Sequence, residues 1–198
     1  MIGLGFAVTL PFSPLVSGKI KVAVLGVGAL GQHHARIYSE LQKAGKVEFI
    51  GLYDANTDRA SEIAKEHNTQ VLVSLDAALE VAQALSIVTP TTTHFDLATQ
   101  ALESGIHVLV EKPMTEEASQ ASKLVQLAQD KNCVLQVGHV ERFNPVFDYL
   151  QSVATEPRFI ETHRLSPYPE RSLDVGVVLD LMIHDLDIVM AFVNSPIK

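Results

Sequence analysis

Three glycines, Gly26, Gly28 and Gly31, carry the clearest chemical signal in this chain. They follow a short apolar run and open a segment with helical periodicity. Glycine there permits a tight turn, a close approach of the backbone to a diphosphate, and close packing of helix on strand. The first amides of the helix also attract an anion. We therefore expect a dinucleotide diphosphate to bind along Gly26, Gly28, Ala29, Leu30 and Gly31.

An acidic residue, Asp54, ends the next expected strand. A carboxylate at that place accepts hydrogen bonds from a ribose diol and repels a 2′-phosphate, so it favours NAD over NADP. The competing interpretation is that Asp54 is an ordinary turn residue before Asn56.

Two further motifs follow later strands of the pattern, at residues 89–94 and 111–113. Ligands in doubly wound sheets lie outside the carboxyl ends of the strands, which is where both motifs fall. A lysine near a nicotinamide ring is suited to proton chemistry. The alternatives are a helix cap for Thr91 or Thr93, an exposed first-turn position for His94, and a surface location for Lys112. The residues expected to bind the cofactor here are Thr89, Pro90, Thr91, His94, Glu111 and Lys112.

Polar residues also follow the last expected strand of this pattern, at residues 138–145. His139, Arg142 and Asn144 are candidates for substrate binding, although Arg142 and Asn144 suit a purely structural junction equally well. Arg164 and Arg171 are further candidates, because a guanidinium group matches the geometry of phosphate oxygens.

The final helical segment, residues 174–193, is apolar on nearly every side yet carries Asp180, His184 and Asp187. At 3.6 residues per turn these three groups share one face. Burying them is costly unless the fold pairs them or they handle protons. A satisfied structural network is the alternative to a catalytic one.

Short β-branched runs alternate with helical patterns from residue 19 onward, which predicts an α/β fold with a doubly wound parallel sheet. Six strands are expected at residues 21–25, 47–53, 70–73, 84–88, 107–110 and 134–137. Five helices are expected between them, at residues 30–44, 57–67, 75–81, 93–104 and 116–131.

The pattern changes after this sheet, with a helix expected over residues 144–153 and a strand over 158–165. We divide the chain into an N-terminal lead at 1–18, a nucleotide-binding domain at 19–140 and the incomplete start of a second domain at 141–198. A lone strand is not stable by itself, which suggests a fragment.

Composition narrows the classes of function. With 198 residues, 47% of them hydrophobic, the chain can bury a core, and its net charge of −8 argues against a nucleic-acid surface. Residues 1–18 lack the basic start of a signal peptide and the length of a membrane span. The single cysteine, Cys133, suits a reducing compartment, so we expect a cytoplasmic protein without a structural metal.

The order of Gly26-x-Gly28-x-x-Gly31, Asp54, Glu111-Lys112-Pro113 and Gly176-x-x-x-Asp180-x-x-x-His184 resembles the glucose-fructose oxidoreductase, inositol dehydrogenase and MocA (Gfo/Idh/MocA) family. The resemblance implies a Rossmann domain followed by an α+β domain with an open antiparallel sheet. It also implies NAD(P)-dependent hydride transfer at a sugar or cyclitol carbinol. Lys112, Asp180 and His184 match its catalytic residues.

Residues 137–145, 164–167 and 174–187 look more narrowly like members that oxidise the 3-hydroxyl of UDP-N-acetylglucosamine, on a route to a diamino-sugar lipid A. This resemblance implies a sugar-nucleotide substrate and a homo-oligomer when the protein is full length. Another sugar or inositol substrate, a non-catalytic NAD-binding protein and a metal-dependent phosphohydrolase remain the alternatives. Lys112 and His184 compete for the role of base.

Overall fold

A computed structural model describes residues 18–165 and 176–193. The described residues form two compact units that divide after residue 137. The expectation for residues 1–17, most of the N-terminal lead, lies outside the described residues.

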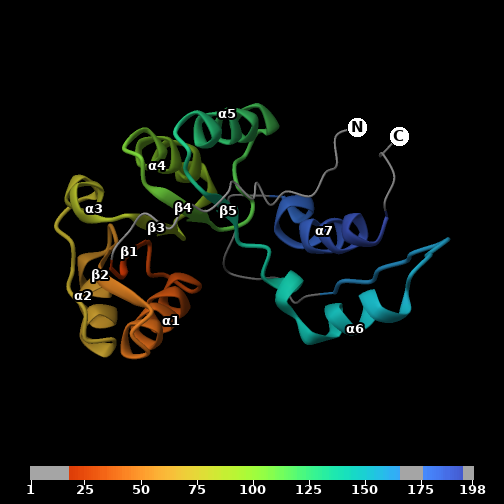
Figure 1. The fold of residues 1–198 in the computed structure, drawn as a ribbon, viewed down its shortest axis with the longest axis horizontal. Coiled ribbons are helices and arrows are strands. Elements are labelled where there is room, and N and C mark those ends of the chain that lie inside the picture. The colour runs from red at the N-terminus through yellow and green to blue at the C-terminus, as the bar shows by residue number, and fades with distance from the viewer. Residues whose placement is uncertain (1–17, 166–175, 194–198) are drawn as a thin grey trace. The chain divides into compact units, whose positions relative to one another are not determined.

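The first unit is built on a parallel sheet of five strands in the order β2-β1-β3-β4-β5 (Figure 1). Each strand is joined to the next by at least one helix, as parallel pairing requires. The strands are β1 (Ile20–Leu25), β2 (Val47–Tyr53), β3 (Ala84–Ile87), β4 (His107–Val110) and β5 (Leu135–Val137). This arrangement confirms the predicted parallel α/β fold.

Helices cover both faces of this sheet and create two hydrophobic cores. Along β1, Val22 and Val24 belong to the core under α1 and α2, whereas Ala23 and Leu25 belong to the core under α3, α4 and α5. The period-2 alternation of a strand produces this division. The helices are α1 (Gly31–Lys43), α2 (Thr57–Glu66), α3 (Leu75–Val81), α4 (Thr91–Glu103) and α5 (Ala118–Asp130).

The strand predicted at residues 70–73 is wrong, so the described sheet has five strands instead of six. This stretch contributes one isolated bridge, in which Val71 lies opposite Leu52. The extended conformation cannot continue because Ser74 caps α3 through a hydrogen bond from the Ala77 N–H to its hydroxyl.

The second unit contains a 3₁₀ turn and two longer helical segments. Phe147 of α6 packs edge-on against Phe192 of α7, with ring centroids 5.5 Å apart. Its elements are η1 (Val140–Phe143), α6 (Pro145–Val153), the π-helical turn η2 (Val178–Met182) and α7 (Ile183–Phe192).

Two expectations for this unit are corrected. Residues 158–165 form no strand, and Phe159 and Leu165 are exposed. No neighbouring strand among the described residues supplies the hydrogen bonds that a strand needs. The predicted helix at 174–193 begins with a π-helical turn that contains Asp180, so a spacing of 3.6 residues does not describe its start. No residue of η2 or α7 is fully buried.

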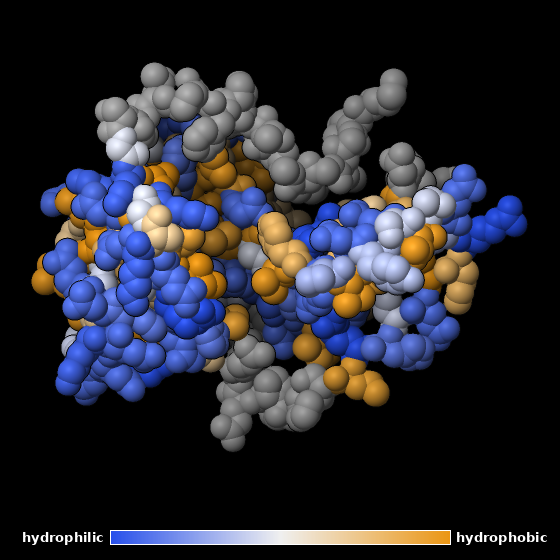
Figure 2. All heavy atoms as spheres, turned by 60° about the horizontal axis from the view of Figure 1, so that its bottom comes forward, coloured by the Kyte–Doolittle hydropathy of each residue, from blue (hydrophilic) through white to orange (hydrophobic). Residues whose placement is uncertain are grey.

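Hydrophilic side chains cover much of the visible surface of the first unit (Figure 2). Cys133 is buried just before β5. None of the described helices combines the length and the apolar character needed to cross a membrane.

Candidate functional site

The glycine turn between β1 and α1 is shaped by steric limits at two of its glycines. Gly26 has a φ of 85°, and a Cβ there would lie 2.6 Å from the carbonyl oxygen of Val88. A Cβ on Gly31 would overlap the carbonyl oxygen of Gly26. Neither position accepts a side chain, so both glycines are needed to close the turn between strand and helix.

Gly28 differs, because a Cβ built there meets no atom within 4 Å. This residue is exposed, and no side chain caps the N-terminus of α1. The structure itself therefore does not require glycine at position 28, whereas a diphosphate lying against the backbone would. The turn has the form expected for a dinucleotide site, and no capping side chain at Leu30 competes with an anion at the N-terminus of α1.

Asp54 follows β2 directly and stabilises the same turn. One carboxylate oxygen accepts a hydrogen bond from the Val27 N–H at 2.7 Å, and the other accepts from the Asn56 N–H at 2.8 Å. Each oxygen has a second lone pair with which to accept a ribose hydroxyl. The two interpretations of Asp54, as a turn residue and as a ribose ligand, are thus compatible.

Arg59, in the first turn of α2, is a residue that the sequence analysis missed. Its Nε donates to the Val27 carbonyl at 3.2 Å, while its two terminal nitrogens donate to Gln32 and Glu62. It therefore ties α2 to the glycine turn and to α1. The signal available in the sequence was an arginine five residues after Asp54.

The loop after β3 leads into α4 two residues earlier than predicted, at Thr91. Pro90 occupies the N-cap position and no side chain caps the helix, so neither Thr91 nor Thr93 acts as the predicted cap. The hydroxyl of Thr93 lies 2.7 Å from that of Thr89. The alternative of an exposed His94 is wrong, because its side chain is 1% exposed.

Glu111 follows β4 and lies against α1. Its Oε1 is 3.2 Å from His34 Nε2, and its Oε2 accepts from the Lys112 N–H at 3.2 Å. Burial acts to raise the pKa of Glu111, but the hydrogen bond and charge of His34, with those of Lys112, lower it overall. The pair joins α1 to the Glu111-Lys112-Pro113 segment, in which the Lys112-Pro113 peptide is cis.

The lowered pKa of Glu111 predicts how the stability of the fold depends on pH. Glu111 stabilises the fold fully above its ordinary pKa of 4.5, and this contribution disappears as the pH falls through the lower pKa of the folded state. We expect Glu111→Gln to lower the melting temperature near pH 7. The difference from wild type should vanish below that pKa. Glu48→Gln, an exposed change on β2, is the control, and a pH-independent effect of Glu111→Gln would contradict the assignment.

The second unit carries an ion pair that explains Asp187. Arg142 Nε donates to Asp187 Oδ2 at 2.6 Å, and Arg142 Nη2 donates to Oδ1 at 2.8 Å. The guanidinium carbon also lies 5.7 Å from the ring centroid of Phe147. Because these contacts join η1, α6 and α7, they support the structural interpretation of Arg142, while its role in substrate binding stays a prediction.

We expect Asp187→Asn to lower the free energy of unfolding by about 1 kcal/mol. A bidentate ion pair stabilises a protein more than a typical surface pair does, but the partial exposure of Arg142 limits this stabilisation. Chemical denaturation of the single and double variants with Arg142→Gln measures the coupling. Glu156→Gln, at an exposed site in the same unit, should change little. Additive effects in the double variant would show that the pair contributes nothing.

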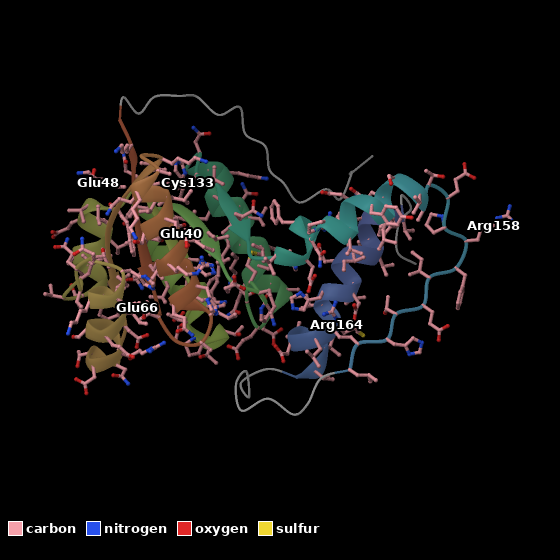
Figure 3. All side chains as sticks on the ribbon, turned by 90° about the horizontal axis from the view of Figure 1, so that it is seen from below. Glu40, Glu48, Glu66, Cys133, Arg158 and Arg164 are labelled. Carbon is pink, nitrogen blue, oxygen red and sulfur yellow. The ribbon has the colours of Figure 1, made fainter. Side chains whose placement is uncertain are left out.

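Other predicted substrate residues also have partners in this unit. Arg164 lies beside α7 (Figure 3), with its Nε 3.0 Å from Asp185 Oδ1. The side-chain oxygen of Asn144 caps α6 by accepting from the Val146 N–H. His139 Nδ1 is 3.9 Å from Asp187 Oδ2. Arg171 lies outside the described residues.

Asp180 and His184 occupy different helical segments. Asp180 is in the π-helical turn and His184 is in the first turn of α7, and both side chains are half-buried. Four residues make roughly one turn in either type of helix, so the shared face of Asp180 and His184 stays a prediction. Among residues 18–165 and 176–193, no group of three or more His, Cys, Asp and Glu side chains is arranged to hold a metal ion.

Comparison with known proteins agrees with this geometry. Residues 20–139 match the model of an oxidoreductase family with an NAD-binding Rossmann fold. UDP-N-acetylglucosamine 3-dehydrogenase of Acidithiobacillus ferrooxidans is 41% identical over 177 residues, which cover 89% of this chain and 55% of that protein. A scyllo-inositol 2-dehydrogenase of Bacillus subtilis is 27% identical over 194 residues, covering 90% of this chain and 55% of its own length.

A solved structure of the Acidithiobacillus enzyme superposes with a TM-score of 0.83 at 40% identity, covering 91% of this chain and 59% of that one. The chain thus spans little more than half the length of the relatives it matches. The family match and the glycine turn confirm the resemblance found in the sequence. This chain belongs to the Gfo/Idh/MocA family of oxidoreductases, which bind NAD on a Rossmann fold.

Proposed function

We propose that the protein is an NAD-dependent dehydrogenase that oxidises a secondary hydroxyl of a sugar nucleotide, the 3-hydroxyl of UDP-N-acetylglucosamine. The observation that carries the proposal is the 41% identity to an enzyme of that name, which covers 89% of this chain. Gly28 and Asp54 add support, because their geometry suits the diphosphate and the ribose of NAD.

The chemistry needs a hydride acceptor, a base and a group that stabilises the developing alkoxide. NAD, when bound, accepts the hydride from the carbinol carbon. The hydroxyl proton passes to His184, and Lys112 stabilises the negative charge on the oxygen. Asp180 orients His184 or the substrate. In the competing assignment, Lys112 takes the proton and His184 binds the hydroxyl.

The proposed product is a 3-keto sugar nucleotide, which an aminotransferase converts to an amino sugar on the route to a diamino-sugar lipid A. We also propose a cytoplasmic location and a homo-oligomer for the full-length protein. These statements are inferred from the resemblance to UDP-N-acetylglucosamine 3-dehydrogenases.

The test is to incubate the purified protein with NAD and UDP-N-acetylglucosamine and follow NADH by its absorbance. Inositol, glucose 6-phosphate and unmodified glucose serve as competing substrates. We expect NADH to form only with the sugar nucleotide. A higher rate with inositol would show that the substrate is a cyclitol and not a sugar nucleotide. NAD binding measured by calorimetry, without turnover of any of these compounds, would favour the non-catalytic alternative.

A further inference from the structure

His94 lies in the first turn of α4, is 1% exposed, and joins two backbone segments. Its Nε2 is 2.8 Å from the Thr89 carbonyl oxygen, and its Nδ1 is 2.9 Å from the Pro113 carbonyl oxygen. Thr89 precedes α4 after β3, and Pro113 directly follows Lys112. The imidazole of His94 therefore joins the two loops that follow the neighbouring strands β3 and β4.

The two carbonyl partners determine how many protons the imidazole ring needs. A carbonyl oxygen only accepts hydrogen bonds, so each ring nitrogen must donate in order to bond to its partner. A neutral imidazole has one N–H and would turn the lone pair of its other nitrogen toward a carbonyl oxygen. Since the side chain is buried, that repulsive contact has no water to relieve it.

Two effects oppose a proton on both nitrogens. Burial disfavours a cation, and so does the positive end of the α4 dipole. In favour of it, both hydrogen bonds become charge-assisted, and such bonds are roughly twice as strong as neutral ones. Glu111, the one acid in segments 89–94 and 111–113, pairs with His34, so the two charge-assisted hydrogen bonds must themselves stabilise the second proton.

We propose that His94 is a positioning residue that donates from both ring nitrogens, as an imidazolium, and thereby holds the Lys112 backbone in place. It acts through the carbonyl groups of Thr89 and Pro113. This inference deepens the proposed function, because it rests on the role assigned to Lys112. The protonation of His94 can nevertheless be tested without turnover.

His107 provides an internal control for that test. Its Nδ1 accepts a hydrogen bond from the Val134 N–H at 3.0 Å, so this nitrogen carries no proton. In protein labelled with ¹⁵N at histidine, ring-nitrogen NMR spectra at pH 7 should show two protonated nitrogens for His94. His107 should show a bare Nδ1. The variants His94→Gln and His107→Gln assign the signals, and a bare nitrogen on His94 would overturn the proposal.

A second measurement tests the positioning itself. With isotope-labelled lysine, the side-chain signal of Lys112, assigned with Lys112→Met, should shift when NADH is added to the wild-type protein. In His94→Gln this shift should be lost while NADH still binds, and in His107→Gln it should remain. An unchanged shift in His94→Gln would refute the positioning role. No shift in the wild type would refute the role of Lys112 instead, whatever the ring nitrogens show.

Discussion

Replacing Gly31 with alanine should destabilise the first unit by more than about 3 kcal/mol, because the new Cβ would overlap the carbonyl oxygen of Gly26. Backbone atoms on both sides of this contact belong to the turn that joins β1 to α1, so neither can move without disturbing the other. Thermal unfolding followed by circular dichroism measures the loss.

The matched variant is Gly28→Ala in the same turn. Its Cβ meets no atom within 4 Å, so we expect stability within about 0.5 kcal/mol of wild type. The methyl group would instead separate the backbone from the diphosphate, and the Kd for NAD should rise by roughly 10- to 100-fold. Calorimetric titration measures it. Unchanged NAD affinity in a folded Gly28→Ala protein would contradict the diphosphate site.

The second large effect is expected at Lys112. If this residue stabilises the alkoxide, Lys112→Met should lower kcat by about 10²- to 10³-fold, the cost of removing one such donor. Its Kd for NAD should stay within roughly threefold, since the diphosphate and adenosine contacts are untouched. Stopped-flow measurement of NADH formation separates the chemical step from product release.

Lys123→Met, an exposed change on α5, is the control for the loss of one positive charge. It should leave both kcat and Kd unchanged. Full turnover by Lys112→Met would remove this residue from the mechanism. A parallel loss of NAD binding would give it a cofactor-binding role instead.

The first unit was largely predictable because its signals are local. The period-2 alternation of β1 and the glycines after it depend on neighbouring residues, and they correctly indicated the parallel sheet and the dinucleotide turn. The strand at 70–73 failed because a short β-branched run does not reveal that Ser74 will cap a helix immediately after it.

Long-range contacts were beyond the sequence. Nothing near Asp187 indicates that Arg142, 45 residues away, will pair with it, and nothing near His94 indicates that two carbonyl groups will bury it. The π-helical turn at Val178–Met182 was also not predictable from the helical period. This segment is apolar on nearly every side, so one additional residue in a turn leaves no visible break in the pattern.

The π-helical turn at Val178–Met182 bears on how this segment can change during evolution. A π turn closes i→i+5 hydrogen bonds and thus holds one residue more than an α turn. Deleting Leu181 would let the helix continue as a regular α-helix and would reduce the spacing from Asp180 to His184 from four residues to three. The helix on either side would keep nearly the same orientation, because a π turn and an α turn each close about one rotation. A change in chain length of one residue can therefore be absorbed within this turn, and the acid and the histidine stay on one side of the helix.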